Sequence, residues 1–133
     1  MANATAVLIY ETQSPLTFNC ASAAAFEKGD MVTLTGATAN IVVAITSSDN
    51  DIFGGIVAEE KIANVGTTVS LYRGGYFKVE VGSAGATVGK DAVISAKNEL
   101  TDYATLDDEK GITWGQFLES GTDGQFVAME LGK

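Results

Sequence analysis

Short stretches in which apolar and polar residues alternate follow one another along most of the chain. From residue 26 onward, clusters of Gly, Asn, Asp, Ser and Thr separate these stretches. Alternation with a period of two is typical of strands that bury one face. The predicted strands are 31–35, 40–45, 52–57, 67–72, 76–81, 88–96, 112–118 and 125–131. Strands spaced about ten residues apart predict an all-β fold, a single compact antiparallel barrel or sandwich formed by residues 26–133.

Three connections in this pattern carry more specific predictions. Arg73-Gly74-Gly75 separates two alternating runs, which predicts a hairpin between them. In its second run, 76–81, apolar residues take one face while Lys78 and Glu80 take the other. The stretch 58–64 has the composition of one or two helical turns, and we expect at most this one short helix in the chain. Residues 97–111 form the longest polar loop.

The first 25 residues differ from the rest of the chain. They contain one carboxylate, Glu11, no cation, and the only proline, Pro15, which favours extended backbone and opposes a helix. Two apolar patches, Val7 to Tyr10 and Leu16 to Phe18, flank a polar linker. Two interpretations of residues 1–25 stay open. The segment is either an extended arm that lies along a partner or an edge strand of the domain's own sheet.

A weak internal similarity links three segments that begin with a turn glycine and continue into a strand: Gly29 to Leu34, Gly66 to Leu71 and Gly89 to Ile94. Any passage from a tight turn into a strand has this composition. We therefore interpret the similarity as generic rather than as a true repeat.

The charge balance bears on possible partners. The net charge is −9 and there is no histidine. A chain this acidic repels phosphate backbones and anionic lipid headgroups, so we expect no nucleic-acid and no membrane partner. The single cysteine, Cys20, excludes an internal disulfide and lies among apolar neighbours, as expected for a buried thiol. No signal peptide is visible, so we expect synthesis in a cytoplasm.

The sequence contains no motif that assembles catalytic chemistry. Without histidine, the commonest general base is missing, and neither a nucleophile elbow nor a phosphate-binding loop occurs. We therefore predict that the protein is not an enzyme and needs no cofactor. Asp49, Asp51 and Glu60 have part of the spacing of a calcium loop, but Phe53 stands at a ligand position, so we predict a solvated turn without metal. The acidic run 107–109 is expected to be a solvated loop as well.

Apolar and aromatic residues near the N-terminus and near the predicted hairpin tip are the candidates for partner contacts. Aromatic residues and arginine are enriched at protein interfaces. Trp114 is expected in the core instead. The predicted contact residues are Val7, Leu8, Ile9, Tyr10, Leu16, Phe18, Tyr72, Arg73 and Tyr76. A carbohydrate-recognition or display module is the alternative, and it requires Tyr72, Tyr76 or Tyr103 to lie exposed on one flat face.

The order of these elements resembles that of the small decoration, or cement, proteins of tailed-phage capsids. In this family a Gly-Asp-x-Val motif, a Gly-Ile/Val-Ala strand, a Gly-x-x-Val turn and a late strand with an Ile-Gly-x-Ala/Phe-Leu pattern follow one another. The similar segments here are Phe26 to Val32, Phe53 to Ala58, Val69 to Leu71 with Gly75 to Phe77, Gly85 to Val93, Ile112 to Leu118 and 125–131. The likeness covers residues 26–132.

The resemblance implies a β-tulip-like barrel that binds the outside of a bacteriophage capsid. It also implies a homotrimer at local threefold positions that contacts the major capsid protein and stabilises the virion shell without chemistry. The N-terminal segment, with Glu11 as its one charged side chain, departs from the family pattern. It is compatible with an arm that contacts the capsid.

Overall fold

A computed structural model describes residues 5–35, 42–45, 52–102 and 112–132, and these contain eleven strands and no helix. The predicted all-β, barrel-forming class is confirmed. The strands are β1 (Val7–Tyr10), β2 (Leu16–Cys20), β3 (Met31–Leu34), β4 (Val42–Ile45), β5 (Phe53–Val57), β6 (Thr68–Tyr72), β7 (Gly75–Val81), β8 (Asp91–Ala96), β9 (Glu99–Asp102), β10 (Thr113–Phe117) and β11 (Phe126–Leu131).

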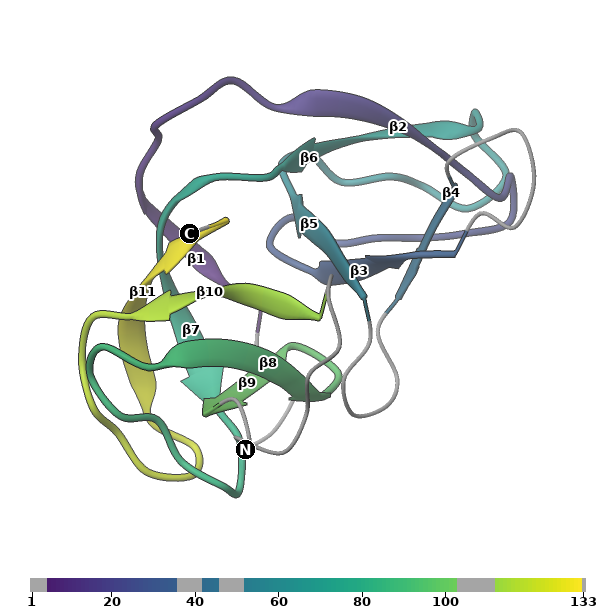
Figure 1. The fold of residues 1–133 in the computed structure, drawn as a ribbon. Helices are drawn as coiled ribbons and strands as arrows, with labels where there is room; N and C mark the ends of the chain where they lie inside the picture. The colour runs from purple at the N-terminus through teal and green to yellow at the C-terminus, as the bar shows by residue number, and fades with distance from the viewer. Residues whose placement is uncertain (1–4, 36–41, 46–51, 103–111, 133) are drawn as a thin grey trace.

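The strands form two small closed barrels rather than the single one that we predicted. Barrel 1 closes in the order β2-β4-β3-β5-β6. Barrel 2 has the order β7-β11-β10-β8-β9 and closes because β9 also pairs with β7 in parallel. Strand β1 pairs with β7 and lies at the end of this second sheet. Figure 1 shows barrel 1 at the upper right and barrel 2, with β1, at the lower left.

The two barrels have the same connectivity. In each, the first strand pairs with the third in parallel and with the fifth antiparallel, and the second–third, second–fourth and fourth–fifth pairs are antiparallel. Both second–fourth pairs contain a register shift. The interpretation of the internal similarity as generic was therefore wrong for two of its three segments, since 29–34 and 89–94 begin equivalent strands.

Backbone hydrogen bonds give the residue-by-residue equivalence between the barrels. The Gly29 N–H donates to the Val57 carbonyl at 2.8 Å, and the Gly89 N–H donates to the Phe117 carbonyl at 2.8 Å. Both glycines have positive φ, 93° and 87°, at the turn before the second strand of each barrel. A constant offset of about 60 residues thus relates the two barrels in this region.

The hydrophobic core of each barrel comes from the inward-facing positions of its strands. Val32, Val43, Val69 and Leu71 are buried in barrel 1. The core of barrel 2 is larger and continues into barrel 1, where it includes Met31 and Ile56, which are equivalent to surface positions of barrel 2. The remaining buried members of this larger core are Ala6, Phe77, Val79, Val81, Ala86, Ala92, Ile94, Leu100, Trp114, Phe117, Val127, Met129 and Leu131.

The joint between the barrels combines ring packing with buried hydrogen bonds. Phe53 of β5 packs edge-on against Trp114 of β10 with 5.0 Å between ring centroids. The Asn98 side-chain amide donates to Asp30 Oδ1 at 3.0 Å, and the Met31 N–H donates to Asn98 Oδ1 at 2.7 Å. Asp30 and Asn98 are both buried. The barrels are therefore held together by an aromatic contact and by buried hydrogen bonds.

The predicted hairpin at Arg73-Gly74-Gly75 was wrong. Strand β6 belongs to barrel 1 and β7 to barrel 2, so this turn carries the chain from one barrel to the other. The Arg73 guanidinium anchors the turn: Nε donates to the Gly54 carbonyl at 2.9 Å, and the group lies over the Phe53 ring at 4.5 Å. The sequence correctly predicted a turn at this position. It did not show that β6 and β7 pack into two separate cores and so do not pair with each other.

Two further elements differ from the predictions. The stretch 58–64 forms bends, a bridge and a turn instead of helix, because Lys61 pairs with Phe26 as an isolated β-bridge. The polar loop 97–111 begins with β9, which follows β8 through a two-residue turn in which Asn98 adopts a φ of 59°. Glu80, expected on a polar face, is buried beside Glu99 of this strand.

Candidate interaction surfaces

Strand β1 carries the most exposed apolar side chains of the predicted contact residues. Val7, Ile9 and Tyr10 are 57%, 51% and 65% exposed. Leu8 points the other way and packs against the core of barrel 2. The strand therefore anchors itself with one side chain and presents three to the outside.

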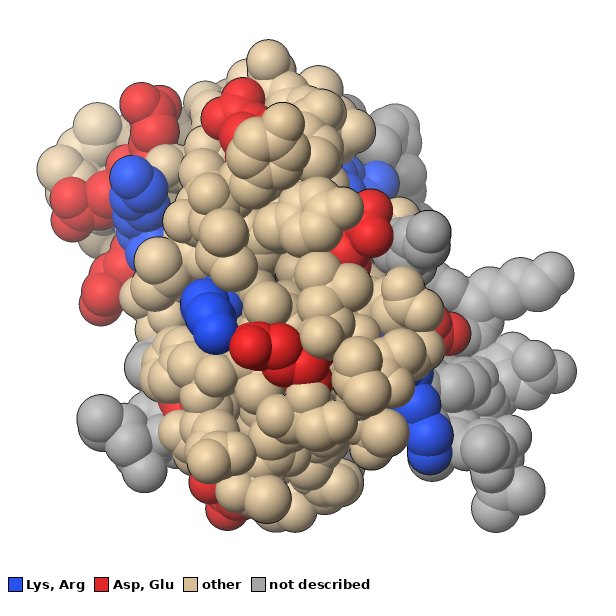
Figure 2. Space-filling model, turned by 90° about the vertical axis from the view of Figure 1, so that its left-hand side faces the viewer, with Lys and Arg blue, Asp and Glu red and all other residues tan. Residues whose placement is uncertain are grey.

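The position of β1 at the end of its sheet adds to this exposure. It pairs with β7 only, as far as the described strands go, and its start is held by the Ala6 N–H, which donates to the Gly29 carbonyl at 2.9 Å. An edge strand with apolar side chains is a ready site for contact with another chain. Figure 2 shows the side of the molecule that lies at the left of Figure 1. Uncharged residues cover most of it.

Strand β2 shows that the apolar N-terminal segment is divided between the two barrels. Phe18 is half-buried against the core of barrel 1, and Cys20 is buried there. Burial raises the pKa of the Cys20 thiol, an effect that the nearby Lys61 opposes. Leu16, at the other end of β2, stays 51% exposed. Within residues 5–25, β1 pairs with β7 of barrel 2 and β2 pairs with β4 and β6 of barrel 1, and contact of this segment with a partner stays a prediction.

The three predicted contact residues around the β6–β7 turn, Tyr72, Arg73 and Tyr76, are less exposed to a partner than Val7, Ile9 and Tyr10 of β1. The Tyr72 ring packs on Phe77 with 5.6 Å between centroids, and its hydroxyl donates to Glu11 at 3.3 Å. Burial and the carboxylates of Glu11 and Glu59 raise the Tyr72 pKa. Arg73 is held by β5, and burial lowers its pKa. Of the three, Tyr76 alone joins the β1 surface, through an edge-on contact with Tyr10 at 6.0 Å.

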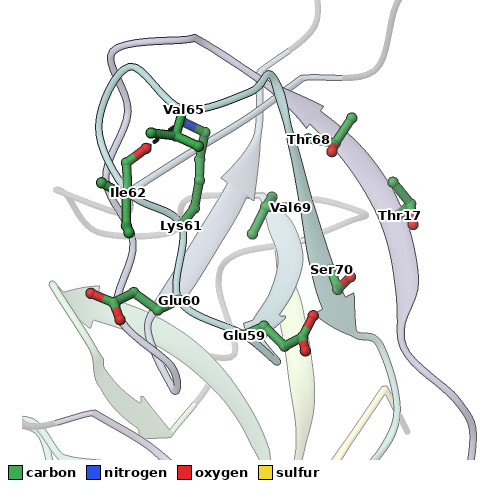
Figure 3. A pocket seen from close by; sticks show the side chains of 9 residues that line it. All are labelled: Thr17, Glu59, Glu60, Lys61, Ile62, Val65, Thr68, Val69 and Ser70. Atoms are coloured by element: carbon green, nitrogen blue, oxygen red, sulfur yellow. Dashed lines mark hydrogen bonds between the residues drawn. The ribbon is translucent and has the colours of Figure 1, made fainter.

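A groove on the outside of barrel 1 was not predicted from the sequence. It has a volume of about 270 Å³ and lies between the β5–β6 connection and the outward faces of β2 and β6. Figure 3 shows the side chains of the connection on one side and Thr17, Thr68 and Ser70 on the other. The internal repeat is the sequence signal that could have pointed to this groove. It makes the segment 55–59 equivalent to 115–119 and so allows the side chains around the two segments to be compared. The full lining is Thr17, Glu59, Glu60, Lys61, Ile62, Val65, Thr68, Val69 and Ser70.

The Lys61 ammonium does not point into this groove as a free charge. It donates to the carbonyl oxygens of Ser22 at 2.9 Å, Ala24 at 2.9 Å and Ile62 at 3.1 Å. With all three donors used, this buried cation ties two connections of barrel 1 together. The charges that the groove presents are therefore carboxylates, those of Glu59 and Glu60.

Across residues 5–35, 42–45, 52–102 and 112–132, no three His, Cys, Asp or Glu side chains gather as a metal site. Asp49, Asp51, Tyr103 and the acidic run 107–109 lie outside the described residues, while Glu60 is exposed. Within the same part of the chain, no helix is long and apolar enough to cross a membrane.

Comparison with known proteins finds similarity in structure but not in sequence. No family model matches the chain, and no curated protein matches it. Among solved structures, the fold is similar to the N base of the head fibre gp8.5 of bacteriophage phi29, with a TM-score of 0.55 and 15% identity. The match covers 88% of this chain and 92% of that one. At this identity, the likeness establishes a shared fold.

Proposed function

We propose that this chain is a structural, non-enzymatic protein of a bacteriophage head that attaches to the outer surface of the capsid. The observation that carries the proposal is the fold match, which spans most of both chains and joins this fold to a phage head fibre base. The order of sequence motifs shared with capsid decoration proteins supports the same role. In this function the chain binds the major capsid protein and stabilises the shell as a homotrimer, without chemistry.

The β1 surface, made of Val7, Ile9, Tyr10 and Tyr76, is the proposed capsid contact. Many copies on one shell add up the contact energy of each small apolar patch. The net charge of −9 keeps the remaining surface soluble. The carbohydrate-recognition alternative would use Tyr76 of the β1 surface, since the ring of Tyr72 packs against Phe77 and Tyr103 lies outside the described residues.

Quantitative co-sedimentation with purified heads of the virus that encodes the chain tests this function. We expect the chain to bind at a fixed number of copies per head and to sediment alone as a trimer. The variant V7S/I9S/Y10S should fold and bind at least about tenfold more weakly, because removing well-packed interface side chains costs about 1 kcal/mol or more each.

A matched control removes exposed apolar side chains elsewhere. Ile52 and Val88 are exposed and lie outside β1, so I52S/V88S should bind heads as the unmodified chain does. Failure of the unmodified chain to bind heads at any concentration contradicts the capsid function. Equal binding by the β1 variant and its control contradicts the β1 contact.

A further inference from the structure

On the outward face of barrel 2, Lys78 forms an ion pair with the carboxylate of Glu119. Glu119 Oε1 lies 2.8 Å from Lys78 Nζ and accepts a hydrogen bond from the Ala128 N–H at 2.8 Å. Lys78 is on β7 and Ala128 on β11, and the two residues are partners in the register. Lys78 thus covers the outside of the β7–β11 pair and neutralises the carboxylate that follows β10.

The equivalent three positions of barrel 1 are Glu59, Thr17 and Ser70. The Ala58 N–H donates to the Ser70 carbonyl at 2.8 Å, as the Leu118 N–H donates to that of Ala128 at 2.9 Å. Thr17 is the register partner of Ser70, as Lys78 is of Ala128.

Barrel 1 therefore keeps the carboxylate but replaces the lysine with a short hydroxyl side chain. The groove of about 270 Å³ lies at this place, lined by Glu59, Thr17 and Ser70 together with Glu60. Figure 3 shows Glu59 at the end of the groove nearest Ser70. The space that a lysine fills in barrel 2 is open in barrel 1.

Two of the chain's own cations, Lys61 and Lys28, lie near the groove, and neither forms an ion pair with Glu59 among the described residues. Lys61 is buried and donates to three carbonyl oxygens. Lys28 lines a neighbouring groove with Glu59, but no ion pair joins the two within the described residues. Glu59 is exposed and carries a negative charge close enough to raise the pKa of Tyr72.

We propose that this groove binds a lysine or arginine side chain from a basic partner chain, in the place that Lys78 occupies in barrel 2. Glu59 accepts the charge-assisted hydrogen bond, and the hydroxyls of Thr17 and Ser70 accept further donors. Ile62 and Val65 on the groove wall are 60% and 61% exposed and pack on the methylene stem. This inference rests on the proposed function, in which the partner chain is the capsid protein.

The charge balance favours a different chain over a second copy. The sequence has 17 acidic and 8 basic side chains. Three of the described cations, Lys61, Arg73 and Lys78, are already engaged within the chain. A second copy carries the same net charge of −9 and offers the groove few unengaged cations, whereas a basic surface is attracted to the groove.

The test uses the full chain and an N-acetylated tetralysine amide as the probe. Backbone amide shifts are followed by NMR at about 0.15 M salt, where attraction beyond about 8 Å is screened. We expect saturable shifts centred on Thr17, Glu59 and Ser70. Thr17→Lys rebuilds the barrel 2 ion pair inside barrel 1 and should abolish these shifts. Glu59→Gln should weaken the binding about tenfold.

Asp91→Asn is the matched control, since it removes one exposed carboxylate from β8 of the other barrel and should leave the shifts unchanged. Shifts spread evenly over the surface, or equal binding by T17K and the unmodified chain, overturn the proposal. If T17K does not fold, the comparison of peptide binding by E59Q and by D91N tests the proposal instead. Glu59 is exposed, so its substitution should leave the fold intact.

Head binding separates this inference from the proposed function. If the unmodified chain and T17K bind heads equally, the function stands and the groove proposal fails. If the chain binds no heads but the peptide still localises to the groove, the capsid function fails and the cation site stands. If T17K or E59Q instead changes the oligomeric state in sedimentation, the groove holds a second copy, and the basic partner chain is ruled out.

Discussion

The two barrels share one connectivity but differ at equivalent surface positions. Met31 and Ile56 are register partners on β3 and β5, and both are buried by the contact with barrel 2. Their equivalents on β8 and β10, Asp91 and Gln116, are register partners as well. Asp91 is exposed and Gln116 is half-buried. Turn glycines and strand pairing are common to both barrels. The two barrels differ at this pair: it is apolar and covered by the other barrel in barrel 1, and polar and uncovered in barrel 2.

The same comparison explains the exposed leucine of β2. Leu16 pairs with Leu71 as Phe77 pairs with Met129, so Leu16 and Phe77 are equivalent. Phe77 is buried, because Tyr72 and the core of barrel 2 pack around it and β1 pairs with its strand. The described residues place no second β1 beside β2, and Leu16 is half exposed. A repeated fold thus acquires different surfaces through the segments added to only one copy.

The largest expected effect is at the joint between the barrels. Trp114→Ala removes a fully buried ring that contacts Phe53 across the joint, and it should lower the free energy of unfolding by about 3–5 kcal/mol. Urea denaturation followed by circular dichroism measures this. A single shifted transition is expected, since Trp114 belongs to the larger core, which also includes Met31 and Ile56 of barrel 1. Two separate transitions would show that the barrels unfold independently and that the joint is weaker than its geometry indicates.

A paired substitution tests the surface asymmetry directly. Met31→Ala leaves a cavity beneath barrel 2 and should cost about 2–5 kcal/mol. The equivalent change, Asp91→Ala, lies on an exposed strand position and should stay within about 0.5 kcal/mol. The same denaturation assay compares them. Similar losses from both substitutions contradict the assignment of Met31 to the inter-barrel interface.

The buried amide at the joint is expected to contribute less than the rings. Asn98→Gly removes the hydrogen bonds to Asp30 and to the Met31 N–H, while glycine tolerates the φ of 59°. The loss should be about 1–3 kcal/mol, because buried polar partners are left without their bonds. Thermal and urea unfolding measure it. A loss below about 0.5 kcal/mol shows that the amide positions the turn without stabilising the joint.

The sequence predicted the strands well because their alternation is local. All eight predicted strands appear within a few residues of their expected bounds. The polar strand β9 was missed since Glu99 and Thr101 are buried by pairing with β7 and β8, which is a tertiary effect. The hairpin at 73–75 failed for the same kind of reason, as nothing local shows that β6 and β7 belong to different cores.

The candidate surfaces were predicted only in part. Apolar residues in a segment with a single charged side chain pointed to β1, and Val7, Ile9 and Tyr10 are exposed. Arg73 was chosen for its residue type, but it is half-buried and its guanidinium is held by contacts with Phe53 and Gly54. The groove depends on the absence of a lysine at position 17, and this absence has meaning only when the two barrels are superposed.

The smallest expected effect concerns a pair of carboxylates found in barrel 2 only. Glu80 and Glu99 are register partners on β7 and β9, whereas the equivalent pair in barrel 1 is Asn19 and Val42. Burial raises the pKa of Glu99, and the charges of Glu80 and Asp123 add to this. The folded state therefore holds the Glu99 proton more tightly than the unfolded chain does. The ionised form destabilises the fold.

Stability should consequently rise as the pH is lowered through the raised folded pKa towards the ordinary glutamate value of 4.5. Glu119 has the opposite effect on the pH dependence of stability, and it acts in a lower pH range than Glu99. The hydrogen bond from Lys78 lowers the Glu119 pKa, so its contribution is lost below pH 4.5. Melting temperatures from pH 8 to about 4.5 measure the Glu99 effect. Glu99→Gln should flatten this slope, while Asp91→Asn should keep it. If the melting temperature of Glu99→Gln depends on pH as steeply as that of the unmodified chain, another group causes the pH dependence, and Glu99 does not distinguish the two barrels in this way.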